Sequence, residues 1–154
     1  ISRLDLVSAR GKRSVINGLQ SVEAKEVIER FEFDKNLSFE AVFPFTYAVD
    51  LLEGNLIVSN FNSRLLKKVP HATHATLQLI VVGLDFEHQN SFIQNSSNKI
   101  TLSLQNATEA DLEFSCALPE SPNVFVLLHL EFFQRVNAVD YDLQAGALKI
   151  VGFQ

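Results

Sequence analysis

Two histidines and two carboxylates are the candidates for a metal site. His71 and His74 lie three residues apart, and Asp85 and Glu87 follow an apolar run. Structural zinc takes four ligands in tetrahedral geometry, and catalytic zinc takes three from the protein. Pro70 puts the histidines at the start of a predicted strand, where alternation sends the two side chains to opposite faces. The sequence therefore favours a loop and strand-edge pair of histidines, and we expect neither a metal nor another cofactor.

Asp85, Glu87 and His88 form a second titratable group that could do acid–base chemistry. Residues two apart in a strand share a face, so the two carboxylates could hold a cation or act as acid and base. A hydrolase would use them with His88 or with His129. Carboxylates at strand ends are also common turn formers, and the sequence favours that interpretation.

Three further side chains interrupt otherwise apolar strands. His129 and Glu131 share one face of the run at residues 124–133, and exposure of that face to solvent explains both. Cys116 alternates with Leu112 and Phe114, which is typical of a small core residue. A nucleophilic thiolate would need a basic neighbour, and none is close in sequence.

Aromatic rings facing solvent would indicate a different function, the binding of carbohydrate or another small ligand. Rings on a sheet face or a loop rim offer an apolar surface for stacking. The candidates are Tyr47, Phe61, Phe92 and Tyr141.

The composition indicates one globular domain. The chain has 154 residues, of which 47% are hydrophobic and 20% charged, with a net charge of −5. This charge argues against nucleic-acid binding, which needs a clustered positive surface. Every apolar run is shorter than the ~20 residues that span a bilayer, so we expect no membrane insertion. We see no signal peptide, which favours a cytoplasmic location.

The hydrophobic pattern changes period along the chain. Ser21 can cap a helix over residues 22–30, and from Leu37 onward apolar residues alternate with polar ones or form continuous runs. We therefore predict a mainly β fold, an antiparallel β-sandwich of the Ig-like or Greek-key type, with one or two short N-terminal helices. Residues 1–35 would be a helical segment packed on the sheet, and residues 36–154 the sandwich. The predicted strands are residues 37–43, 45–51, 56–61, 76–86, 100–104, 112–116, 124–133 and 147–153.

Several short motifs occur in an order that resembles an uncharacterised family of hypothetical proteins from Bacteroidota. They are SARGKR at residues 8–13, YAVD at 47–50, PHATH at 70–74, VGLDFE at 82–87 and EFFQRVN at 131–137. Where the family carries glycine after its Val-Asn pair, this chain has Ala138. The resemblance implies a bacterial protein of which this chain is the C-terminal portion. It implies no activity, cofactor or site.

Many apolar strands, thirteen phenylalanines and the lack of a catalytic motif favour a structural or protein-interaction module without catalytic activity. Its partner would be another protein or further copies of itself. The alternatives are a carbohydrate or other small-ligand binding module and, less favoured, a hydrolase using Asp85, Glu87 and His88.

Overall fold

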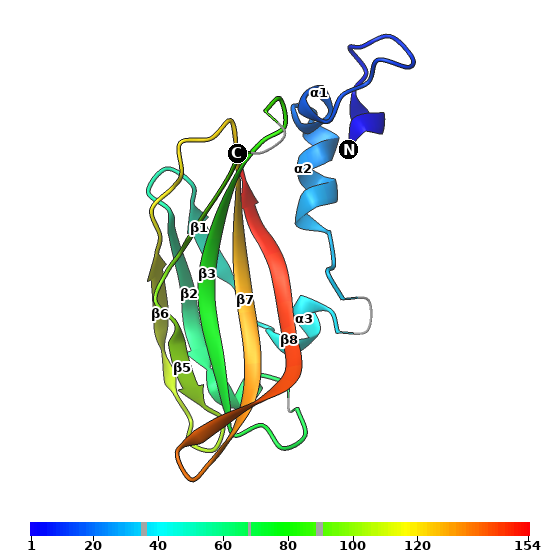
Figure 1. The fold of residues 1–154 in the computed structure, drawn as a ribbon. Coiled ribbons are helices and arrows are strands. Elements are labelled where there is room, and N and C mark those ends of the chain that lie inside the picture. Colours follow the sequence, from blue (N-terminus) through cyan, green and yellow to red (C-terminus); the bar gives the residue numbers. More distant parts are fainter. Residues whose placement is uncertain (35–36, 68, 89–90) are drawn as a thin grey trace.

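The computed structural model describes residues 1–34, 37–67, 69–88 and 91–154 and contains two antiparallel sheets (Figure 1). Sheet A has the order β1-β2-β6, made of β1 (Tyr47–Asp50), β2 (Asn55–Asn62) and β6 (Glu109–Ser115). In sheet B, β3 (His74–Asp85) and β7 (Asn123–Val136) are central, and β8 (Val139–Phe153) is one edge. The other edge holds β4 (Ser91–Ser96) and β5 (Ile100–Ser103), which pair with successive parts of β3. The mainly β, sandwich-like prediction is confirmed; its Ig-like detail stays a prediction.

The core lies between the two sheets because alternate residues of the long strands point inward. On β7 the inward residues Val126, Leu128, Leu130 and Phe132 are all buried. The opposite face of β7 is only half-buried, and the strand is hydrogen-bonded on both edges, to β3 and to β8. Covered faces and paired edges explain why residues 124–133 are apolar at nearly every position. The predicted strands at residues 124–133 and 147–153 lie in β7 and β8, which pair with each other.

Two helices cover part of the outer face of sheet B. They are α1 (Val15–Leu19) and α2 (Val22–Glu29), preceded by a 3-10 turn, η1 (Ser2–Leu4). The predicted cap is confirmed, since the Ala24 N–H donates to Ser21 Oγ at 3.1 Å. Leu19 and Ile28 form a small buried cluster with Ile150 of β8. The predicted boundary at residues 35 and 36 lies outside the described residues.

The strand predicted over residues 37–43 is wrong, because this segment contains a short helix, α3 (Phe39–Val42). Ser38 Oγ accepts a hydrogen bond from the Ala41 N–H and caps the helix. Phe39, Val42 and Phe43 are all buried. These three residues are three and four positions apart, which places them on one face of a helix. The two-residue alternation of Phe39 and Phe43 fits a strand equally well, so the sequence pattern did not distinguish the two.

The region around Phe92 also differs from expectation. Residues 87–99 lie outside every predicted strand, but they contain β4, which pairs with β3 from Ile80 to Asp85. The connection from β2 to β3, which begins with the 3-10 turn η2 (Ser63–Leu65), carries the chain from sheet A to sheet B.

Candidate functional site

The outer face of sheet B, which points away from sheet A, is divided into an apolar and a polar half. In the apolar half, α1 and α2 pack over β8 and the adjoining part of β7, against Phe125, Leu127 and Ile150. Beside this cover lies a row of side chains that stays partly exposed, which we call the apolar strip. It consists of Ile80, Val82 and Leu84 of β3 and Phe92 of β4. Phe92 is 59% exposed.

β4 presents a free edge next to the apolar strip. The Ser97 N–H donates to the Leu79 carbonyl at 2.9 Å, so the backbone groups of Ser97 point toward β3. Because these groups alternate along a strand, those of Phe92, Gln94 and Ser96 point away from β3. In the described part of the chain no strand lies beyond β4 to receive them.

The remaining sheet edges are short, charged or covered, and each of these features opposes pairing with another chain. β5, on the same edge of sheet B as β4, has only four residues. β6 has three acidic residues in seven positions, Glu109, Asp111 and Glu113, and charged side chains discourage edge pairing. β1 has only four residues, and β8 is contacted by α2 and α3. Lys149 of β8 also pairs with Glu40 of α3. β4, with the sequence SFIQNS, has no charge, proline or register shift.

The polar half of the outer face is organised around Glu131 on β7. Its carboxylate accepts hydrogen bonds from Lys99 Nζ at 3.0 Å and Thr76 Oγ1 at 3.3 Å, and lies 3.9 Å from His129 Nε2. Desolvation raises the Glu131 pKa, but the Lys99 hydrogen bond and nearby positive charge outweigh it, and the pKa is lowered. His129 and Glu131 therefore lie on a solvent-facing side of the strand and are partnered there.

His74, the first residue of β3, lies in the polar half opposite Phe133 of β7. Its ring stacks on Phe133, with centroids 5.4 Å apart, and its Nδ1 lies 2.9 Å from Thr73 Oγ1. His71 is in the turn before β3, with a φ of 67°. Arg135 Nε and Nη2 donate to the two Asp140 oxygens at 2.6 and 2.9 Å, which lowers the Asp140 pKa.

The predicted metal candidates do not come together. His74 and Asp85 are the two ends of β3, roughly 36 Å apart at the usual rise per residue. Among residues 1–34, 37–67, 69–88 and 91–154, no three His, Cys, Asp or Glu side chains gather in a way that could hold a metal ion.

Asp85 and His88 do meet, in the turn between β3 and β4. Asp85 Oδ2 lies 2.9 Å from His88 Nδ1, and Asp85 Oδ1 accepts the N–H groups of Glu87 and His88 at 2.9 and 3.2 Å. The side-chain hydrogen bond lowers the Asp85 pKa and raises the His88 pKa. His129 pairs with Gln78, which is seven residues from Asp85 along β3, or roughly 23 Å. The contacts of Asp85 are those of a turn-forming residue, and His129 is too distant to act with it.

The four aromatic candidates do not form one platform. Phe61 is 1% exposed and lies in the core, and Tyr47 is partly buried against it. Phe92 and Tyr141 are exposed, at 59% and 54%. Phe92 pairs with Leu84, whereas Tyr141 pairs with Gln134, beyond the other end of β3. The two exposed rings are therefore on the order of 30 Å apart.

Cys116 is buried, and desolvation raises the pKa of its thiol. Both observations suit a core residue.

None of the helices in the described ranges has the length and apolar character needed to cross a bilayer. Comparisons of the chain with family models, with curated proteins and with solved structures gave no match. The family resemblance of the short motifs therefore stays a proposal.

Proposed function

We propose that this chain is a structural, protein-interaction β-sandwich module that self-associates through β4 and acts by binding rather than by catalysis. The observation that carries the proposal is the contrast between the six-residue, unprotected β4 edge and the other edges, of which β1 and β5 are short, β6 is acidic and β8 is covered. Natural sheets blunt their edges with charge, short strands or covering elements. An uncharged six-residue edge that also carries two exposed apolar side chains, Phe92 and Ile93, is suited to pairing with another strand.

A second copy suits this edge better than an unrelated strand because β4 is compatible with itself. Two copies related by a two-fold axis would pair antiparallel, and such an interface repeats the same patch on both sides. Pairing about Gln94 would join the outward backbone groups of Phe92, Gln94 and Ser96 to those of the other copy. No like charges would oppose each other, whereas two β6 edges would bring Glu109, Asp111 and Glu113 together.

Side chains on both faces of β4 support the same interface. Phe92 lies on the outer face, next to the apolar strip, and Ile93 on the opposite face is 45% exposed. Pairing would remove part of both side chains from water at about 25 cal/mol per Å². A single edge of this length buries little area, so we expect a weak, concentration-dependent dimer.

The test is sedimentation equilibrium over a wide concentration range, with two matched variants. Ile93→Lys places a charge on the β4 edge, and Ile57→Lys places the same charge on the central strand of sheet A, where Ile57 is similarly exposed at 41%. We expect the wild type and Ile57→Lys to dimerise and Ile93→Lys to remain monomeric. A monomeric wild type, or an Ile93→Lys variant that still dimerises, would overturn the proposal.

A further inference from the structure

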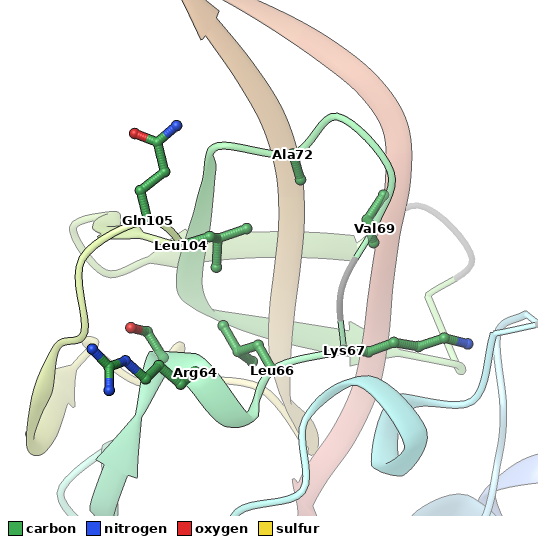
Figure 2. A pocket seen from close by; sticks show the side chains of 8 residues that line it. Arg64, Leu66, Lys67, Val69, Ala72, Leu104 and Gln105 are labelled. Atoms are coloured by element: carbon green, nitrogen blue, oxygen red, sulfur yellow. The ribbon is translucent and has the colours of Figure 1, made fainter.

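A cavity lies at the end of the sandwich where the chain passes from sheet A to sheet B. It has a volume of about 380 Å³ and is lined by residues of the 63–72 segment and by Leu104 and Gln105, which follow β5. Figure 2 shows four apolar side chains converging on it, with polar side chains around them. The apolar four are Leu66, Val69, Ala72 and Leu104. We call this cavity the cup.

Backbone hydrogen bonds hold the walls of the cup. The Lys67 N–H donates to the Val42 carbonyl at 3.2 Å, and the Leu104 N–H donates to the Thr73 carbonyl at 2.9 Å. A turn closes the third side, where the Ala72 N–H donates to the Val69 carbonyl at 3.1 Å. The apolar floor is an extension of the core, since Leu66 belongs to the main buried cluster and the other three pack against it. The cup is therefore formed before any ligand enters.

Two cations beside the cup, Arg64 and Lys67, form no ion pair with the part of the chain that the structure describes. Arg64 and Lys67 extend on either side of Leu66 (Figure 2), and both are exposed. In the described part of the chain beyond Arg13, every other lysine and arginine has a carboxylate within 4.0 Å. These are Lys25, Arg30, Lys99, Arg135 and Lys149. Among the described residues, no ion pair engages Arg64 or Lys67, and no acidic side chain lines the cup.

We propose that the cup binds a small amphiphilic carboxylate, with the apolar body on the four apolar side chains and the carboxylate between Arg64 and Lys67. An apolar floor with a few polar groups at the mouth is the usual design of a small-ligand site, and the volume is near the lower end of the usual ~300–1,000 Å³. Arginine and lysine both favour a carboxylate partner. Their charged tips lie outside the floor, and no ion pair restrains them from turning toward a bound anion. The cup is at the opposite end of β3 from the β4 pairing, so the two proposals can fail separately.

Isothermal titration calorimetry with three probes tests the proposal. Octanoate has both parts of the expected ligand, octanol lacks the charge and acetate lacks the apolar body. We expect saturable binding of octanoate at one site, with octanol at least about fivefold weaker and acetate not measurable. Arg64→Gln and Lys67→Gln should each weaken octanoate about fivefold.

The matched control is Lys12→Gln, which removes an unpaired, exposed cation far along the chain. It should leave octanoate binding unchanged. The proposal is overturned if octanoate gives no saturable binding, if octanol binds as tightly, or if Lys12→Gln weakens binding as much as Arg64→Gln and Lys67→Gln do. Amide chemical shifts must also change at Ala72 and Leu104; changes confined to another region would place the ligand elsewhere and contradict the assignment.

Discussion

Ile28→Ala tests whether the helical segment is held to sheet B by one small cluster. Ile28 is 5% exposed and packs with Leu19 and Ile150. Truncating a buried isoleucine to alanine costs about 2–5 kcal/mol, with the lower end where the surroundings can close the gap. The cluster lies on the outside of sheet B under two short helices, not between the two sheets, which favours the lower end of this range. We therefore expect a loss of about 2 kcal/mol, which lowers the melting temperature by about 4–8 °C in a domain of this size.

The matched control is Val27→Ala, the neighbouring position on α2, where the side chain is 50% exposed. Both changes introduce the best helix former, so a difference between them reports packing rather than helix propensity. Val27→Ala should stay within about 0.5 kcal/mol of the wild type. The assay is thermal unfolding followed by circular dichroism, and equal stability of the two variants would refute the packing argument.

Hydrogen exchange on Ile28→Ala adds a second readout. The α2 amides should lose protection while those of β7 keep it, because β7 is paired on both sides within sheet B. Equal loss of protection in β7 would mean that the helices and the sheet unfold as one unit, contrary to this account.

Two further predictions concern turns. Asn137 and Ala138 form the two-residue β7–β8 turn, with φ values of 50° and 64°. This left-handed conformation costs an alanine about 1–2 kcal/mol. Because glycine adopts it freely but loses more backbone entropy on folding, Ala138→Gly should stabilise the protein by about 0.5–1 kcal/mol; a lower melting temperature would contradict this. For the Asp85–His88 pair, the lowered Asp85 pKa gives stability that is lost as pH falls through it, and the raised His88 pKa gives stability that is lost as pH rises through it. The pair therefore stabilises the fold fully between the ordinary pKa values of 3.8 and 6.5. An NMR titration of Asp85→Asn should show the His88 pKa falling back toward 6.5, and an unchanged pKa would refute the link.

The long strands could be predicted because burial alone determines their pattern. β3 and β7 lie in the middle of sheet B, and their inward residues are buried without exception between Ala75 and Val81 and between Val126 and Phe132. A continuous apolar run reports this environment directly.

β4 could not be predicted because little in its own sequence distinguishes it from a polar loop. Its strand conformation comes from hydrogen bonds to β3 rather than from burial of its side chains, most of which are exposed. The signal that was available is the adjacent pair Phe92 and Ile93 within a polar stretch. α3 was missed for a different reason, because Phe39 and Phe43 fit both a two-residue and a helical period.

The cup also could not be found from sequence. Its lining comes from the 63–72 segment and from Leu104 and Gln105, which only the pairing of β5 with β3 brings together. The sequence of residues 64–69 is basic and apolar, but these residues lie outside every predicted strand and carry no motif that points to a cavity.

The most direct test of the central claim is amide hydrogen exchange across β4 at low and at high protein concentration. The N–H groups of Ile93 and Asn95 should be protected at both concentrations because they bond to β3. Those of Phe92, Gln94 and Ser96 should gain protection only at high concentration, when a second β4 pairs with them. Exchange at these three positions that stays fast at every concentration would contradict the claim.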